Sequence, residues 1–261
     1  MDSMTSSQNV PILRSEKLSV QFGALRAVNR LDFHIYHGEL FGLIGPNGAG
    51  KTTVFNAITN TVPLSGGDVH FDGKSLHGLK THQIAVLGIV RVFQAATIFS
   101  RIPTMVHIMN GLDCRTKATM WSSLFRTSFF YREEAASRKR AEELIEFANL
   151  QGLEEHLAES LTWAQQKRLM LATALAAYPK LILLDEPFAG MTADEIAEMI
   201  ALIRAIRSSG MTVFIIDHNM KVMQQICDRI MVLNFGQKLT EGPPDEVSCN
   251  PHVIEAYLGY E

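Results

Sequence analysis

A glycine-rich segment between an apolar run and a helical pattern constrains the fold more than any other part of the sequence. Residues 39–44 before it read as a short buried strand, and residues 53–59 after it read as a helix. The segment fills every position of the pattern G-x-x-x-x-G-K-[ST], with the residues Gly45, Pro46, Asn47, Gly48, Ala49, Gly50, Lys51, Thr52 and Thr53. A strand, a glycine loop and a helix in this order predict a phosphate-binding loop in an α/β fold.

The residue types of this segment suit a nucleoside triphosphate. Glycines let the backbone approach the phosphates closely, and successive N–H groups and the positive end of the helix dipole then point at them. Lys51 would reach the β- and γ-phosphates, and the Thr52 hydroxyl would hold Mg²⁺. The alternative is a glycine-rich turn with a chance lysine. The flanking strand and helix make a nucleoside triphosphate with Mg²⁺ the better interpretation.

The remaining hydrophobic patterns predict a P-loop NTPase core, a mainly parallel sheet with flanking helices, that carries two additions. Residues 18–22 and 31–35 alternate like half-buried strands, which predicts an antiparallel β subdomain. A helical pattern at about 101–170 predicts an inserted α-helical subdomain. We expect a single domain over residues 1–261, with a flexible start at 1–10.

Apolar runs in the second half of the chain predict the strands of the parallel sheet. Residues 181–184 and 211–216 are continuously apolar, as expected for strands covered on both faces. Between them, Thr192 and Glu195 have the spacing of a helix capping box, and Ser209 with Gly210 forms a stop signal. Residues 230–239 read as a closing hairpin.

The composition excludes several other classes of protein. The net charge is −3 without a long basic block, so nucleic acid is not expected as a partner. The three cysteines show no C-x-x-C spacing, which speaks against a disulfide framework or a zinc site. The apolar runs are too short to span a bilayer and the start lacks a signal-peptide core, so the isolated chain is expected to be soluble.

Two carboxylates end one of the buried strands. Asp185 and Glu186 follow four apolar residues, and a buried acid pair is costly unless a cation or hydrogen bonds compensate it. In a P-loop protein that cation is Mg²⁺ with its water shell. Asp185 would contact the metal through water, and Glu186 would polarise the attacking water. The alternative is a strand that ends in a solvated acidic turn.

Three further residues are candidates with weaker individual signals. Gln94 could bind both Mg²⁺ and a water, although a glutamine there can also simply end a strand. His218 could donate a hydrogen bond to the γ-phosphate, or satisfy a local backbone group. Phe22 could stack on an adenine ring, or pack in the core.

The order of these pieces along the chain resembles the nucleotide-binding subunits of ABC transporters, from about residue 18 to residue 259. The order begins with an aromatic residue, the phosphate loop, a glutamine and a helical region. It continues with the segment Leu161-Thr162-Trp163-Ala164-Gln165, the acidic strand and a histidine. The resemblance implies that Gln94 is the Q-loop glutamine, Glu186 the catalytic glutamate and His218 the switch histidine.

Within that superfamily the chain looks most like the ATPase subunits of branched-chain amino-acid importers. The local similarities are Arg91-Val92-Phe93-Gln94, Gly190-Met191, Asp217-His218-Asn219-Met220 and the tail at residues 253–259. The resemblance implies ATP clamped between two such subunits, identical or different. It also implies integral-membrane permease subunits, a separate substrate-binding protein, and a peripheral position on the cytoplasmic face of the cell membrane.

The chain departs from the family in its signature segment, which approximates L-S-G-G-Q. Thr162 keeps a hydroxyl and Gln165 is retained, but Ala164 replaces a glycine. The resemblance places Thr162, Ala164 and Gln165 against the γ-phosphate held by the opposite subunit. A positive φ at Ala164 would cost about 1 kcal/mol, whereas a helical φ would cost almost nothing. We expect hydrolysis to be retained but slowed.

Two other functions stay open beside transport. The first is a soluble ABC ATPase that acts on ribosomes or DNA; the single phosphate loop and the lack of sustained heptads between Gln94 and Leu161 speak against it. The second is a regulatory ATP binder that closes without hydrolysis; the presence of Glu186 speaks against it, and Ala164 keeps it open.

Overall fold

The computed structural model describes residues 10–92, 101–113 and 128–258. The chain divides into two compact units. The first comprises Met1–Arg91, Leu181–Pro187 and Ile203–Glu261, and the second comprises Val92–Lys180 and Phe188–Leu202. Across these described stretches, no helix combines the length and the apolar character needed to cross a membrane. The expected flexible start at residues 1–10 lies, except for Val10, outside the described residues.

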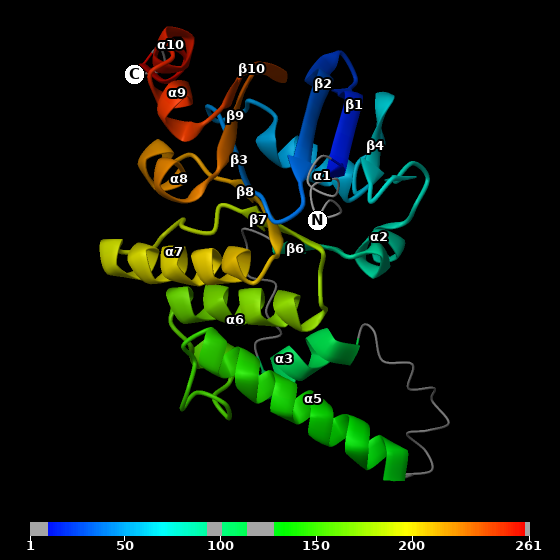
Figure 1. The fold of residues 1–261 in the computed structure, drawn as a ribbon, viewed down its shortest axis with the longest axis vertical. Coiled ribbons are helices and arrows are strands. Elements are labelled where there is room, and N and C mark those ends of the chain that lie inside the picture. The colour runs from blue at the N-terminus through cyan, green and yellow to red at the C-terminus, as the bar shows by residue number, and fades with distance from the viewer. Residues whose placement is uncertain (1–9, 93–100, 114–127, 259–261) are drawn as a thin grey trace, which may run out of the picture. The chain divides into compact units, whose positions relative to one another are not determined.

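The first unit contains a four-stranded sheet in the order β2-β1-β4-β5, and Figure 1 labels its strands β2, β1 and β4. Its strands pair antiparallel, as the alternating pattern predicted. They are β1 Pro11–Phe22, β2 Leu25–Tyr36, β4 Gly66–Phe71 and β5 Lys74–Ser75. β1 begins well before the predicted residue 18. A register shift between Ser15 and Leu18, with Lys17 at φ 49°, breaks the alternation that a sequence pattern can detect.

The same unit holds a six-stranded sheet in the order β10-β9-β3-β8-β7-β6. β3 lies at its centre and pairs parallel with β8 and β9, while β7 pairs parallel with β8. Every residue of β3, β7 and β8 is buried, which explains their continuous apolar runs. The strands are β3 Leu40–Ile44, β6 Ile89–Val92, β7 Leu181–Asp185, β8 Thr212–Ile216, β9 Arg229–Asn234 and β10 Gln237–Gly242.

Aromatic side chains join the two sheets to the helix that follows the glycine loop, α1 Lys51–Ile58. The ring of Phe214 in β8 lies 5.3 Å from that of Phe41 in β3 and 4.9 Å from that of Phe55 in α1. Phe33 of β2 lies 5.8 Å from Phe214 as well. Burying each such ring contributes about 2 to 3 kcal/mol, so the core fixes α1 firmly at the end of β3.

The second unit is mainly helical, with α3 Thr104–Asp113, α5 Ser128–Phe147 and α6 Trp163–Ala176. Its short connections include η1 Ala158–Ser160. One face of α5, continued by the residue just after it, is buried: Ala141, Leu144, Ile145 and Ala148 are at most 3% exposed. α3 and α6 pack so closely at Gly111 that a Cβ on this residue would lie 2.4 Å from the carbonyl oxygen of Thr173.

The predicted capping box opens α7 Ala193–Ser208. The backbone N–H of Thr192 donates to the Glu195 carboxylate at 2.8 Å, and the Glu195 N–H donates to the Thr192 hydroxyl at 3.4 Å. Gly210, at φ 88°, follows the helix as predicted. The remaining helices are α2 Thr81–Leu87, α8 Met220–Ile226, α9 Pro244–Ser248 and α10 Pro251–Leu258.

Candidate functional site

Three parallel strands bring the predicted site segments to one edge of the six-stranded sheet. Ile216 at the end of β8 pairs with Leu43 of β3 on one side and with Asp185 of β7 on the other. The glycine loop, the acid pair and the segment that starts at Asp217 therefore all leave the sheet at its carboxyl edge. In open α/β sheets, ligands bind at this edge.

The glycine loop ends in a helix start that brings no capping side chain. Gly50 is the N-cap of α1 and has φ 103°, a conformation that favours glycine. A Cβ on Gly50 would also lie 2.3 Å from the carbonyl oxygen of Ala27. Within the described part of the chain, no side chain caps the first-turn amides of α1, and the helix dipole favours an anion there.

The side chain of Lys51 lies back over the loop. Its ammonium group donates to the carbonyl oxygens of Gly45 at 2.7 Å and Pro46 at 2.9 Å. Burial lowers the pKa of Lys51, and the nearby charges of Glu186, Asp217 and Asp185 oppose that shift. The hydrogen-bond acceptors of this ammonium among the described residues are carbonyl oxygens, and a phosphate at this place would offer it a charged acceptor.

A cavity of about 470 Å³ opens beside the loop. Phe22 lies on its wall and is 49% exposed, so this ring is not a core residue. The full lining is Phe22, Leu25, Arg26, Ala27, Asn47, Gly48, Gly50, Lys51, Thr52, Thr53, Glu186, Phe235 and Gly236. An aromatic ring, a phosphate loop and a carboxylate therefore share one space, as binding of a nucleotide requires.

The two acids at the end of β7 lie in different environments. Asp185 is 4% exposed and accepts a hydrogen bond from the Arg91 guanidinium at 2.6 Å. Glu186 lines the cavity and has φ 48°, an uncommon left-handed conformation for a residue with a side chain. Its N–H donates to the carbonyl of Ile216 at 2.8 Å, which holds that conformation. Backbone strain of this kind concentrates at functional sites.

The predicted switch histidine lies at the same sheet edge, on the segment after β8. His218 is exposed and its Nδ1 lies 3.9 Å from the carboxylate of Asp217, which is almost fully buried. His218 does not contribute to the lining of the cavity. Gln94 lies outside the described residues.

The signature segment belongs to the second unit, where it starts α6. Thr162 is the N-cap, and its hydroxyl accepts from the N–H of Gln165 at 3.3 Å. The Gln165 side chain accepts in return from the N–H of Thr162 at 2.9 Å. Ala164 is 3% exposed and lies within the helix, so a cost from positive φ does not apply to it.

Comparison with known proteins decides the family. The family model described as "ABC transporter" matches residues 28–189, a range that runs from β2 through the phosphate loop and the signature segment to the acids. The chain belongs to the ABC transporter family. A second model, described as "Branched-chain amino acid ATP-binding cassette transporter", matches residues 237–261.

Curated relatives resemble this ABC subunit over nearly its whole length. The high-affinity branched-chain amino acid transport ATP-binding protein BraF of Pseudomonas aeruginosa is 37% identical, with 95% of this chain and 98% of the relative covered. LivG of Escherichia coli, with the same description, is 36% identical at the same coverage. The lipopolysaccharide export system ATP-binding protein LptB of Haemophilus influenzae is 32% identical, with 95% and 97% covered.

Solved structures give the same fold. The ADP conformation of an ATP-binding cassette of an ABC transporter superposes with a TM-score of 0.83 at 28% identity, covering 96% of this chain and 99% of that one. A nucleotide-free cassette superposes with a TM-score of 0.82 at 27% identity, covering 95% and 99%. The P-loop α/β fold and the class of ATP-binding, ATP-hydrolysing transporter subunit are therefore confirmed.

Within this cassette, Trp163 connects the signature helix to the loop after the acids. Its indole N–H donates to the carbonyl of Ala189 at 3.0 Å, and the Lys167 ammonium donates to the same oxygen at 3.0 Å. Gly190, at φ 75°, leaves room for the ring, since a Cβ there would lie 3.1 Å from the indole nitrogen. No local sequence pattern predicts this contact of Trp163, because it joins residues that are 26 positions apart.

Sequence reasoning also missed one aromatic residue in the ABC cavity. Phe235 forms the tip of the turn between β9 and β10, is 73% exposed and lines the cavity together with Phe22. The signal in the sequence was an aromatic residue before a glycine in a two-residue hairpin turn. In the structure Phe235 at φ 44° and Gly236 at φ 74° both have left-handed backbone.

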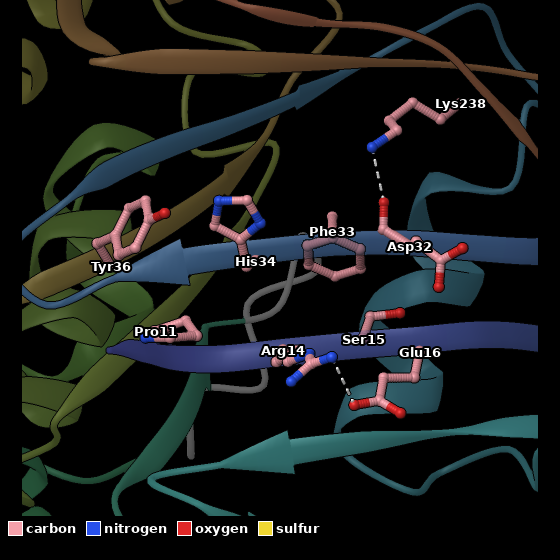
Figure 2. A pocket seen from close by; sticks show the side chains of 9 residues that line it. All are labelled: Pro11, Arg14, Ser15, Glu16, Asp32, Phe33, His34, Tyr36 and Lys238. Atoms are coloured by element: carbon pink, nitrogen blue, oxygen red, sulfur yellow. Dashed lines mark hydrogen bonds and ion pairs between the residues drawn. The ribbon is translucent and has the colours of Figure 1, made fainter. Parts of the chain in front are cut away.

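A second hollow, of about 460 Å³, lies on the antiparallel sheet of the ABC subunit (Figure 2). Arg14 forms an ion pair with Glu16 at 3.1 Å, and the Lys238 ammonium donates to the carbonyl of Asp32 at 2.8 Å. Its lining is Pro11, Arg14, Ser15, Glu16, Asp32, Phe33, His34, Tyr36 and Lys238. Its basic groups are offset by carboxylates and carbonyls, and none of the described residues that line it belongs to the glycine loop.

Proposed function

We propose that the chain binds MgATP in the cavity beside the phosphate loop and hydrolyses it when a second ATP-binding subunit closes over that site. The supporting observation is the shared lining of this cavity, which joins Phe22 for the adenine ring, Lys51 for the phosphates and Glu186 for the attacking water. The backbone N–H groups of Gly48, Gly50, Lys51, Thr52 and Thr53, which line this cavity, would surround the phosphates.

The residues present fit a magnesium ion. Thr52 lines the cavity and offers a hydroxyl, and the Asp185 carboxylate lies at the end of the neighbouring strand. One oxygen of that carboxylate, Oδ1, is buried without a hydrogen-bond partner in the described part of the chain. A water on Mg²⁺ would supply that partner. Bound there, the ion would neutralise charge on the β- and γ-phosphates. Gln94 remains a proposed ligand on resemblance.

Each side chain then has a separate task in hydrolysis. Lys51 exchanges its carbonyl acceptors for phosphate oxygens, so that the buried ammonium donates to negatively charged acceptors. Glu186 orients the attacking water as a general base, and His218 donates to the γ-phosphate from the next strand end. Thr162, Ala164 and Gln165 act on the nucleotide of the opposite subunit, where the start of α6 faces the γ-phosphate.

The transported substrate is proposed to be a branched-chain or related amino acid, taken up through separate permease subunits. BraF and LivG, whose names state branched-chain amino acid transport, are 37% and 36% identical to this chain. The match of residues 237–261 to a branched-chain model favours this substrate over the lipopolysaccharide named for LptB. A separate binding protein would deliver the substrate, and the chain would lie on the cytoplasmic face of the membrane as one domain with a helical subdomain.

The variant Glu186→Gln tests the catalytic assignment. We expect it to bind ATP, to lose hydrolysis by about 100-fold or more, and to form a dimer in the presence of MgATP, because the amide cannot accept the proton of water. Phosphate release measures hydrolysis, and size-exclusion chromatography with light scattering measures the dimer. A variant that hydrolyses ATP at the normal rate would show that Glu186 is not the base.

Uptake measurements test the substrate separately. Cells from which this chain is deleted should lose import of radiolabelled leucine, isoleucine or valine, and the unmodified chain should restore it. The Glu186→Gln variant should not restore it. Normal amino-acid uptake together with a defect in lipopolysaccharide export would replace the importer by an exporter and leave the ATPase assignment intact.

A further inference from the structure

A buried arginine links three elements beneath the nucleotide cavity. Arg91 in β6 has only 6% of its side chain exposed. One terminal nitrogen, Nη2, lies 2.6 Å from Oδ2 of Asp185 in β7, and the other, Nη1, donates to the Asn56 side-chain oxygen in α1 at 2.6 Å. The helix that carries the phosphate loop and the strand that carries the acids are thus joined by one guanidinium.

This contact is specific to the shape of arginine. A guanidinium offers N–H groups in a rigid planar fork, so a single group can bind Asn56 and Asp185 at the same time. The aromatic ring of Phe55 lies 5.5 Å from the guanidinium carbon and supports its position. Lysine at this place would keep the charge but could not keep both contacts in the same geometry.

The pairing leaves the two oxygens of Asp185 in different states. Oδ2 is occupied by Arg91, whereas Oδ1 is buried and has no hydrogen-bond partner within the described ranges. A carboxylate held through one oxygen cannot rotate without breaking a buried ion pair, which is costly. The orientation of Oδ1 is therefore set before any nucleotide arrives.

We propose that Arg91 is a positioning residue that fixes the Asp185 carboxylate so that Oδ1 accepts a hydrogen bond from a water of the nucleotide-bound magnesium ion. This inference rests on the proposed function. Arg91 itself contacts neither nucleotide nor metal. It acts by restricting Asp185 and by holding α1, which carries Thr52, in register with the end of β7.

If Arg91 positions Asp185 for the magnesium ion, replacing Arg91 should weaken nucleotide binding that depends on Mg²⁺ and leave binding without Mg²⁺ unchanged. The Arg91→Lys variant should bind ATP in EDTA about as well as the parent, because the phosphate loop is unchanged. It should need about ten-fold more Mg²⁺ for half-maximal enhancement of binding, as is usual when a partner behind a metal contact is lost. The measurement is a Mg²⁺ titration of fluorescent mant-ATP binding to the full chain carrying Glu186→Gln, so that no hydrolysis occurs.

Two further variants complete the test. Asn56→Ala removes only the second support of the guanidinium, and it should shift the Mg²⁺ midpoint in the same direction by about three-fold. It decides the outcome if Arg91→Lys does not fold. Arg207→Lys is the matched control, because Arg207 also pairs with an aspartate, Asp228 at 2.6 Å, but is 46% exposed. Its Mg²⁺ midpoint should be unchanged.

The possible outcomes are distinct. A raised Mg²⁺ midpoint in Arg91→Lys and Asn56→Ala, with unchanged binding in EDTA, supports the proposal. A lower melting temperature with an unchanged midpoint overturns it and leaves Arg91 a purely structural residue. If the Glu186→Gln parent binds no mant-ATP at all, the proposed function fails and this inference fails with it.

Discussion

Two helices of this ATPase subunit start next to functional segments, and they start in opposite ways. α1 begins after Gly50, whose left-handed backbone carries no side chain to the first-turn amides. α6 begins after Thr162, whose hydroxyl caps the N–H of Gln165 while the Gln165 side chain caps the N–H of Thr162. One helix start depends on a ligand, and the other is already capped in part by its own residues.

The difference indicates two ways of using a helix dipole. At α1 an anion completes hydrogen bonding that the chain leaves undone, so binding to this segment should be strong in the isolated subunit. At α6 an anion would compete with the capping box or use only the remaining amides, so its contribution should be smaller and conditional on closure. Substitutions at the two starts should therefore have very unequal effects.

The largest effect is expected for Lys51→Ala. Removing the ammonium should lower ATP hydrolysis by about 100-fold or more, because Arg26 is then the one cationic side chain left among the described residues that line the cavity. ATP binding by the isolated subunit should fall in parallel, as measured by mant-ATP titration. Retained binding with lost hydrolysis would limit Lys51 to the chemical step and weaken the contrast drawn between α1 and α6.

Gly50→Ala should have the next largest effect. The new methyl group would lie 2.3 Å from the Ala27 carbonyl oxygen at φ 103°, so the loop must move. We expect a loss of about 3 kcal/mol in unfolding free energy, measured by urea denaturation, and about ten-fold weaker ATP binding.

Gly48→Ala is the matched control. Its φ of 78° is also left-handed, but a Cβ there has no neighbour within 4 Å among the described atoms. The cost should be about 1 kcal/mol of unfolding free energy, measured by the same urea denaturation. Equal effects of the two substitutions would mean that backbone strain, rather than the packing of the loop against Ala27, determines the shape of the site.

Local sequence patterns could predict part of this structure. The phosphate loop, the buried strands and the acid pair are local patterns, and in the structure the loop and the acid pair leave the sheet at the same edge. Comparison with known proteins confirms the fold class and the family. The capping box of α6 is also a local pattern, since Thr162 and Gln165 are three residues apart, but the family resemblance indicates only a nucleotide contact for these residues.

Other features could not be inferred from local patterns. Arg91 and Asp185 are 94 residues apart, and their ion pair exists only because β6 and α1 converge on the end of β7. The position of Phe235 at the cavity depends on the packing of a hairpin turn against β2, where the Gly236 carbonyl accepts from the N–H of Asn29. Such contacts depend on tertiary packing, and the spacing of residues in the sequence does not predict them.

Thr162→Ala should have a moderate effect that appears only after assembly. Loss of the cap should lower the unfolding free energy by about 1 kcal/mol. ATP binding by the isolated subunit should be unchanged, while hydrolysis by the assembled transporter should fall about ten-fold if the hydroxyl also contacts phosphate. Thr162→Ser keeps the hydroxyl and should behave like the unmodified chain. A hydrolysis defect no larger than the stability loss explains would limit Thr162 to its capping role.

Ala164→Gly should have the smallest effect, and it tests the remaining departure from the family signature. Ala164 lies in the first turn of α6 with helical backbone, so a glycine there relieves no strain and should cost about 0.5 to 1 kcal/mol of helix stability. Hydrolysis by the assembled transporter should stay within about two-fold of the unmodified rate, since removing the methyl leaves the first-turn amides of α6 in place. A rate increase clearly above that range would show that the methyl group itself obstructs the γ-phosphate, and slowed hydrolysis would then be a built-in property of this subunit.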